Sequence, residues 1–363
     1  MSLYDLQLTD WQKLLADQPS FRPKQIWQSI HERALRPELL TSLPKELREK
    51  LAGLPELNSA FKLLHLSADD RHLTEKAIFE LNDGQVIETV LMHYADRSTV
   101  CISSQAGCAM NCAFCATGQR GFYRHLSIGE IAEQVIWAIS RTRITRGSKR
   151  LSNVVFMGMG EPLANTRNVF GAIRRINEDI GIGARHITVS TVGIVPGIKL
   201  FTDLGLQVNL AVSLHAANNQ KRSSIVPINN RYPIEQLTKA LQEYANTTNR
   251  RISFEWAMMD GINDFENDAR QLIALCIPLQ AHVNLIPLNP TPGWPTKGSP
   301  FEKVVGFANI LDNAGVAVSI RENRGTNIDA ACGQLAGTLA ESKTGERLSL
   351  TNSARMNIDA LLD

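Results

Sequence analysis

Three cysteines stand close together in this chain and could bind a metal cluster. The run is Cys108-Ala-Met-Asn-Cys112-Ala-Phe-Cys115, and the flanking Gly107 and Gly118 favour a loop. Cysteine thiolates are the usual ligands of iron–sulfur clusters. Because three protein ligands leave one position of a four-iron cluster open, the spacing predicts an iron that a substrate or cofactor can bind.

Zinc-ribbon and ferredoxin motifs fit the cysteine spacing less well. A zinc ribbon needs a second C-x-x-C pair, but Cys101, Cys276 and Cys332 are isolated. The ferredoxin pattern C-x2-C-x2-C-x3-C-P is not present. Three structural cysteines in a core remain an alternative, which the glycine-flanked loop disfavours.

The C-x3-C-x2-C pattern resembles the signature of the radical S-adenosylmethionine (SAM) superfamily. This resemblance implies a 4Fe–4S cluster held by Cys108, Cys112 and Cys115. It also implies that the amino and carboxylate groups of SAM chelate the open iron.

Length and composition limit the possible classes of protein. The chain has 363 residues, enough for one large domain and a smaller one, and 44% hydrophobic with 20% charged residues is typical of a soluble globular protein. It lacks both the apolar core of a secretory signal and a run of about 20 apolar residues, so we expect no membrane partner. Six cysteines in such a chain favour the reducing cytoplasm.

Basic residues gather beside the cysteine run. Between Arg120 and Arg150 there are seven lysines and arginines against two acidic residues, which suits phosphate contacts but equally a solvated helix end. Arg22, Lys24, His31, Arg33 and Arg36 give a second basic stretch, weakly indicative of RNA.

From Ser98 onward, strand and helix patterns alternate. The predicted strands lie near 99–103, 153–157, 186–191, 208–213, 252–258 and 283–287; the predicted helices lie near 128–144, 166–179, 196–204, 234–246, 266–277 and 301–314. Six such units predict an α/β fold with a parallel sheet. Since a closed barrel of this type needs eight, we expect an incomplete (β/α)6 barrel.

The remaining chain divides around this barrel. We expect a small helical accessory domain at 1–75 that binds RNA, a β-hairpin extension at 76–97, the barrel at 98–320 and a C-terminal segment at 321–363. The hairpin prediction rests on Asn82-Asp83-Gly84, which favours a tight turn between two apolar runs.

Polar residues follow the predicted strands where an active site of a parallel barrel would lie. The cysteine run follows the first strand, Gly158 to Pro162 the second, and Ser190 and Thr191 the third. Ser213, Leu214 and His215 end the fourth, Glu255 and Asp260 lie near the end of the fifth, and Asn284 and Asn289 mark the sixth.

These residues match the groups of SAM. Gly160 lets the backbone approach closely, and Glu161 can accept hydrogen bonds from the ammonium. Ser190, Ser213 and Asn289 suit the carboxylate and ribose, and the backbone at Leu214 and His215 could meet the adenine. No G-x-G-x-x-G motif follows a strand, so a Rossmann-type SAM site is not expected.

The two remaining thiols complete the pattern. Cys101 ends the first predicted strand, and Cys332 lies in a glycine-flanked segment after the barrel, whereas Cys276 lies on an apolar helix face typical of a core residue.

The chain resembles the dual-specificity 23S rRNA/tRNA adenine-C2 methyltransferases of the RlmN type. The stretches that carry this resemblance are 86–90, 101–108, 108–118, 158–163, 213–216, 289–290 and 328–337.

The resemblance implies a route with two SAM molecules per turnover. The first methylates Cys332, and the second, on the cluster, yields a radical that takes hydrogen from the S-methyl group. The resulting methylene adds to adenine C2, Glu88 acts as the base, and Cys101 releases the product by forming a transient disulfide with Cys332. The partners implied are 23S rRNA, tRNA and an electron donor such as flavodoxin.

Two alternatives remain open from the sequence. One is methylation at adenine C8, as in Cfr-type enzymes, although the stretch 328–337 looks more like the C2 enzymes. The other is an iron–sulfur RNA-binding sensor without catalysis, for which Cys332 would be dispensable.

Overall fold

One ten-stranded sheet forms the framework of the protein. The computed structural model describes residues 2–147, 149–289, 291, 293–321, 325, 328–331 and 333–335. The strand order is β1-β2-β3-β4-β7-β8-β9-β10-β11-β12, antiparallel from β1 to β4 and parallel from β4 to β12. The strands are β1 (Phe61–Ala68), β2 (Thr74–Leu81), β3 (Val86–His93), β4 (Ser98–Cys101), β7 (Leu151–Phe156), β8 (Ile187–Thr191), β9 (Asn209–Ser213), β10 (Ser253–Met258), β11 (His282–Pro287) and β12 (Val318–Ile320).

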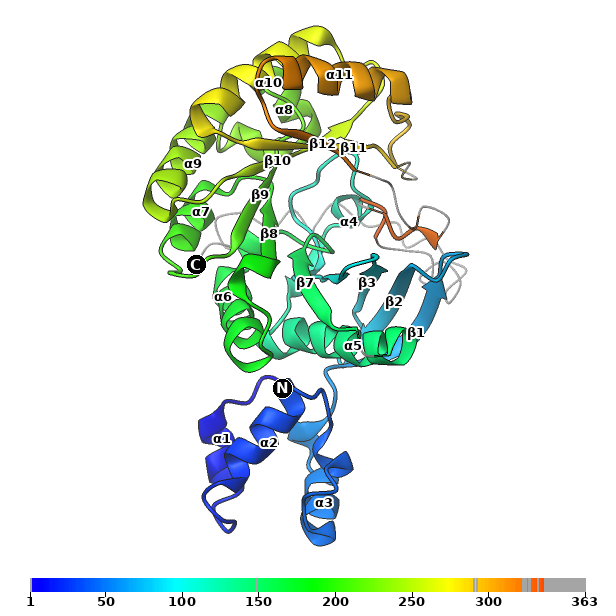
Figure 1. The fold of residues 1–363 in the computed structure, drawn as a ribbon, viewed down its shortest axis with the longest axis vertical. Helices are drawn as coiled ribbons and strands as arrows, with labels where there is room; N and C mark the ends of the chain where they lie inside the picture. The colour runs from blue at the N-terminus through cyan, green and yellow to red at the C-terminus, as the bar shows by residue number, and fades with distance from the viewer. Residues whose placement is uncertain are drawn as a thin grey trace.

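All six predicted strand–helix units are present. The helices that follow the strands are α5 (Ile128–Arg146), α6 (Thr166–Arg174), α7 (Val195–Thr202), α9 (Ile234–Thr248), α10 (Glu266–Leu279) and α11 (Phe301–Asn313). Figure 1 shows them along the outer side of the curved sheet. The apolar faces of these helices pack on the strands. The sequence therefore alternates between runs rich in Val and Ile, which form the strands, and segments with helical periodicity.

The sheet has one parallel strand more than predicted. The three-residue strand β12 pairs with β11, and it is too short to show a pattern of its own. Within the described ranges β12 pairs with no second strand, so hydrogen bonds do not close the sheet into a barrel.

The N-terminal helices are confirmed, but the helical prediction up to residue 75 is wrong at its end. Helices α1 (Leu8–Leu14), α2 (Arg22–His31) and α3 (Lys45–Ala52) form a lobe below the main body in Figure 1. Residues 61–68 instead form β1, paired antiparallel with β2. Because only Phe61 of this strand is fully buried, its sequence lacks the apolar alternation that predicts a strand.

Hydrogen bonds join the N-terminal lobe to the main body. After α6 the chain continues as a π-helical turn, Arg175–Asp179. The buried Arg175 guanidinium donates to the carbonyl oxygens of Tyr4 and Leu6 and lies 4.7 Å from the ring centre of Trp27. The Trp27 indole N–H in turn donates to Asp179 over 2.9 Å. These contacts fix the lobe against one end of the sheet.

A buried carboxyl group lies at the same junction. Glu133 of α5 accepts hydrogen bonds from the Ser59 hydroxyl and from the Ala60 amide, the latter over 2.8 Å. Burial disfavours its charged form and raises the pKa of Glu133 to about 7, although the two hydrogen bonds act in the opposite direction.

This raised pKa predicts a pH-dependent stability. A glutamate in the unfolded chain has a pKa of ~4.3. Below that pH the stabilisation that comes from the raised pKa is fully present. This contribution is lost as the pH rises through about 7. We expect the free energy of unfolding to fall between roughly pH 4 and 7, and Glu133→Gln to remove this part of the decline. Urea unfolding of both proteins at several pH values measures the difference; equal slopes would contradict the assignment.

Candidate active site

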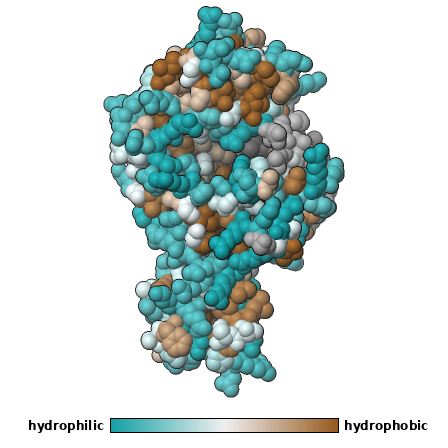
Figure 2. All heavy atoms as spheres, viewed as in Figure 1, coloured by the Kyte–Doolittle hydropathy of each residue, from teal (hydrophilic) through white to brown (hydrophobic). Residues whose placement is uncertain are grey.

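A large cavity lies along the inner side of the parallel strands. Its volume is ≈ 940 Å³, and residues from β4, β7 to β11 and the C-terminal segment line it. Figure 2 shows the corresponding face of the molecule hollowed near its centre. Parallel strands place their carboxyl ends at one edge of a sheet, which is why the residues that follow them meet here.

Most of the predicted site residues line this one cavity. They are Cys101, Cys108, Cys112, Cys115, Gly160, Glu161, Ser190, Ser213, His215 and Asn289. Leu214 and Glu88 are buried but are not part of the lining. Cys332 lies outside the described residues, whereas its sequence neighbours Ala331 and Gly333 line the cavity.

A small hairpin holds the cysteine loop. Strands β5 (Gln105–Gly107) and β6 (Phe122–His125) pair antiparallel on either side of the loop and of the short helix α4 (Ala116–Gln119). The Cys108 amide donates to the Gly121 carbonyl over 2.7 Å. At Gly107 the backbone has φ +74°, and an added Cβ would lie 2.1 Å from the Gly121 oxygen. Only glycine therefore permits this approach.

The chemistry of the three loop thiols suits a positively charged group. Burial raises the pKa of Cys108 and Cys112, and the neighbouring Cys115 raises both further. Deprotonating these thiols in a buried wall needs a cationic partner, which an iron–sulfur cluster would supply. No group of three His, Cys, Asp or Glu side chains in the described ranges is arranged to hold a metal ion. A four-iron cluster is larger than one ion, so its ligands stand further apart.

The loop after β7 presents Gly160 and Glu161 to the cavity. A Cβ at Gly160, where φ is +100°, would lie 2.5 Å from the Gln105 side chain, so glycine brings the two loops together. The Glu161 carboxylate accepts from the amides of Leu163 and Val192, over 2.9 and 2.8 Å. Burial nevertheless raises the pKa of Glu161 to about 7. A bound ammonium would offset that burial and favour the carboxylate.

His215 faces the cavity as a neutral donor. Its backbone has φ 58°, and its Nδ1 accepts from the Ala257 amide over 3.0 Å. Burial lowers the pKa of His215 to about 3, with a further contribution from Arg222. Since Nδ1 is an acceptor and the ring is neutral, the proton is on Nε2. Leu214, by contrast, has its amide bonded to the Glu255 carbonyl over 3.1 Å.

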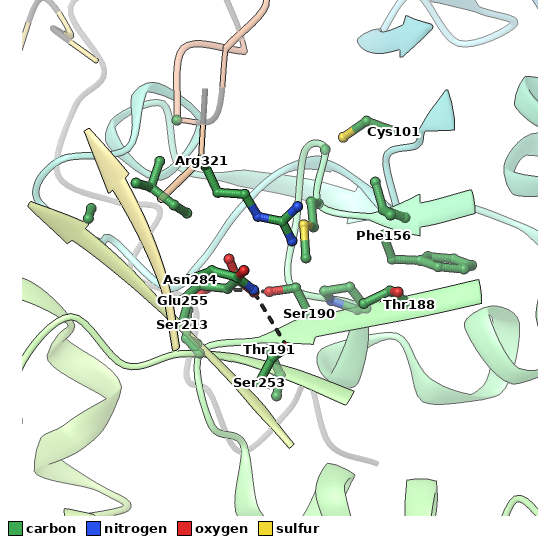
Figure 3. Close-up of a pocket in the computed structure, with 18 of the residues that line it drawn as sticks. Cys101, Phe156, Thr188, Ser190, Thr191, Ser213, Ser253, Glu255, Asn284 and Arg321 are labelled. Atoms are coloured by element: carbon green, nitrogen blue, oxygen red, sulfur yellow. Dashed lines mark hydrogen bonds between the residues drawn. The ribbon is translucent and has the colours of Figure 1, made fainter. Parts of the chain in front are cut away.

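Polar side chains also extend deeper into the cavity than predicted (Figure 3). The hydroxyls of Ser190 and Ser213 lie 3.4 Å apart. Glu255 and Asn284 are paired in register in the middle of β10 and β11, and the Asn284 amide donates to Glu255 over 2.7 Å. Glu255 and Asn284 therefore lie part-way along their strands and not at the carboxyl ends of these strands. Asp260, predicted near the carboxyl end of β10, is exposed and pairs with Lys303 at 2.9 Å.

Arg222 organises two of these loops, and the sequence did not indicate it. Its side chain is fully buried and donates to Val192 O and to Leu214 O, the latter over 3.2 Å. A third bond, of 3.0 Å, reaches Asn229. Burial lowers its pKa to about 10. In the sequence Lys221-Arg222 resembles any solvated basic pair, so only the fold distinguishes the two residues.

Cys101, Val90 and Lys76 stand opposite one another on β4, β3 and β2. Cys101 is buried. Glu88, two residues before Val90, is 2% exposed, and its carboxylate lies 3.8 Å from the Lys76 ammonium. Since residues two apart in a strand share a face, Glu88 lies on the same side of the sheet as Cys101.

Many of the predicted phosphate-binding residues make contacts within the protein. Arg124 pairs with Asp83 and Glu130, and Arg141 pairs with Glu75 at 2.7 Å. Arg143, Arg146 and Lys149 donate to backbone carbonyl oxygens. In the second basic stretch, His31 is fully buried and burial lowers its pKa to about 3. Arg124 and Arg141 are thus neutralised within the protein, whereas Arg143, Arg146 and Lys149 keep their positive charge.

Comparison with known proteins identifies the class of this site. Residues 102–273 match the radical SAM superfamily model. A radical SAM methyltransferase from Sphaerobacter thermophilus is 44% identical, with a TM-score of 0.88 over 92% of this chain and 99% of that one. The fold and the cysteine loop are those of a radical SAM protein.

The curated relatives define the family. This chain is 45% identical to the probable dual-specificity RNA methyltransferase RlmN of Chloroflexus aurantiacus and 46% identical to that of Salinispora tropica. Each match covers 92% of both chains. The chain belongs to the RlmN family. Among the described residues, no helix is long and apolar enough to span a membrane.

The cysteine loop gives a test with a matched control. Gly107→Ala adds a Cβ against the Gly121 oxygen, whereas Gly121→Ala, at φ +81°, meets nothing within 4 Å. We expect Gly121→Ala to cost about 1 kcal/mol of stability for its backbone conformation alone. Gly107→Ala should cost more and also lower the iron bound after anaerobic reconstitution. Equal iron content and equal melting temperatures in the two variants would refute the role of this contact.

Proposed function

We propose that this protein is a SAM-dependent methyltransferase that methylates C2 of an adenine in 23S rRNA and in tRNA, with Cys332 as the methyl carrier. The main support is that Ala331 and Gly333, on either side of Cys332 in the sequence, line the same cavity as Cys101 and the three loop cysteines. The relatives are described as probable dual-specificity RNA methyltransferases, which supports RNA as the substrate.

In this proposal, the parts of the chain have separate roles. We assign 98–320 to an open radical SAM barrel and 321–363 to the carrier segment. Of the predicted accessory domain 1–75, we assign the helical part that ends before β1 to RNA binding, whereas 61–68 join the hairpin extension 76–97 in the antiparallel part of the sheet. An RNA substrate agrees with the cytoplasmic location expected from the sequence.

The lining residues suit a cluster and SAM. Cys108, Cys112 and Cys115 would hold the cluster, and Gly160, Glu161, Ser190, Ser213, His215 and Asn289 would hold SAM. The sequence also suggested Leu214, which does not line the cavity and whose amide donates to the Glu255 carbonyl. When bound, these cofactors supply the one-electron chemistry that activates a methyl carbon. Two SAM molecules per turnover and an electron donor such as flavodoxin complete the requirements.

The residues of the chain perform the remaining steps. The Cys332 sulfur carries the methyl group, whose activated carbon forms a bond to adenine C2. The adduct must then give up one electron, which the cluster would accept, and Glu88 takes the proton that leaves C2. The Cys101 thiolate then attacks the Cys332 sulfur, and the carbon–sulfur bond breaks with its electron pair on carbon, which takes up a proton. The two sulfurs are left as a disulfide, which an external thiol reduces.

Adenine chemistry shows why such a route is needed. C2 is an electron-poor carbon without useful nucleophilicity, so direct transfer from a sulfonium would fail. A carbon radical adds there, and the covalent adduct must then be released by a second thiol. Methylation at C8 would use the same thiols, and mass mapping of the modified base distinguishes the two products.

Cysteine variants test the carrier mechanism. After anaerobic reconstitution with iron and sulfide, we expect mass spectrometry to find an added CH2 on Cys332. Cys332→Ala should lower RNA methylation by at least about 100-fold, and Cys101→Ala should accumulate a covalent protein–RNA adduct. Cys276→Ala is the matched control, because Cys276 is buried in α10 and does not line the cavity.

The same measurements distinguish the alternative functions. A Cys332→Ala protein that still methylates RNA would overturn the carrier mechanism. A wild-type protein that binds iron but never cleaves SAM under reducing conditions would favour an RNA-binding sensor.

A further inference from the structure

Strand β2 buries two consecutive charged residues on opposite faces of the sheet. Glu75 accepts two hydrogen bonds from the Arg141 guanidinium of α5, of 2.7 and 3.1 Å. Lys76 points the other way, and only 4% of its side chain is exposed. A buried ammonium is costly unless oxygen atoms surround it, so the contacts of Lys76 indicate what it holds in place.

The partners of Lys76 belong to the proposed carrier and base. Its Nζ donates to the backbone oxygen of Asp329 over 3.1 Å, and it lies 3.8 Å from Glu88 Oε2. Asp329 precedes Cys332 by three residues in the sequence. One ammonium therefore contacts both the segment that carries Cys332 and the carboxylate proposed as the base.

Strand β2 contacts this segment at a second point. Gly325 has φ +67°, and a Cβ there would lie 2.9 Å from Thr74 Cγ2. The Gly325 carbonyl accepts from the amides of Ile328 and Ala330, over 3.2 and 2.8 Å. The turn that begins the carrier segment is thus packed on β2 next to Lys76.

The other end of the segment is held at the cysteine loop. The Ala116 amide donates to Gly333 O over 2.9 Å, and the Thr117 hydroxyl donates to Leu335 O over 2.7 Å. Both donors are in α4, directly after Cys115. Cys332 lies in the sequence between the Asp329 contact and the Gly333 contact.

We propose that Lys76 is a positioning residue, which fixes the upstream end of the Cys332 segment and holds the Glu88 carboxylate near that segment. The inference about Glu88 and catalysis rests on the proposed function; the inference about the segment rests on the contacts alone. Removing the ammonium leaves the Asp329 carbonyl without this donor and Glu88 without this cation.

Hydrogen exchange tests the segment without requiring activity. In the full-length protein, Lys76→Met keeps the apolar stem and removes the charge. We expect backbone amides of the 325–335 peptide to exchange at least about 10-fold faster in this variant, because their segment loses its anchor. Glu75→Gln, which weakens the ion pair on the opposite face, should leave that peptide unchanged. Equal protection in Lys76→Met and wild type would overturn the proposal.

Activity then tests the link to catalysis. For RNA methylation we expect Lys76→Met to lower kcat by at least about 10-fold, with Lys76→Arg recovering part of the loss and Glu75→Gln staying within about twofold of wild type. We expect KM for RNA to change little, since Lys76 is buried away from solvent. Wild-type kcat in Lys76→Met would overturn the positioning role.

The two readouts separate this inference from the proposed function. If Lys76→Met loosens the 325–335 peptide but wild-type protein forms no S-methylcysteine at Cys332, the proposed function fails and the anchoring by Lys76 stands.

Discussion

The short strand β4 is the constraint on which the arrangement of the site depends. It pairs antiparallel with β3 on one edge and parallel with β7 on the other, so the two parts of the sheet meet there. All four of its residues are buried, and the last is Cys101. The chain then enters the hairpin that holds the cysteine loop. Any shift of β4 by one residue would turn Cys101 to the opposite face.

Burial gives the cavity its electrostatic character. It raises the pKa of Glu161 and lowers those of His215 and Arg222, each through the cost of holding a charge away from water. Arg222 offsets this cost by donating to carbonyl oxygens of the loops around it. Glu161 lines the cavity, whereas Arg222 does not, so a ligand ammonium such as that of SAM would meet the Glu161 carboxylate and offset the cost of its burial.

The sequence predicted the parts of the fold that have a strong period. The six strand–helix units follow from apolar, β-branched runs and helical spacing, and the residues after these strands line the cavity because parallel strands end together. The short strands β5, β6 and β12 span at most four residues, too few for a pattern. The sequence did not predict β1, because this strand is defined by its pairing with β2 and most of its side chains are not buried.

Single charged residues were harder to predict than elements. Lys76 and Arg222 are buried, whereas Asp260 is exposed, yet all three types are commonly found at surfaces. Their places depend on which partner the tertiary fold brings near. Glu255 shows the same limit on a smaller scale, because the sequence placed its strand correctly but not its depth within that strand.

The connectivity of the sheet has a consequence for how the chain is made. Strands β1 to β4 are consecutive neighbours joined by short turns, so their contacts are local, whereas each parallel pair from β4 to β12 needs a crossover through a helix. Since β4 ends at Cys101 and β7 begins at Leu151, we expect the antiparallel meander to pair before β7 leaves the ribosome. The open edge of β4 would then be available for pairing with the parallel strands that follow.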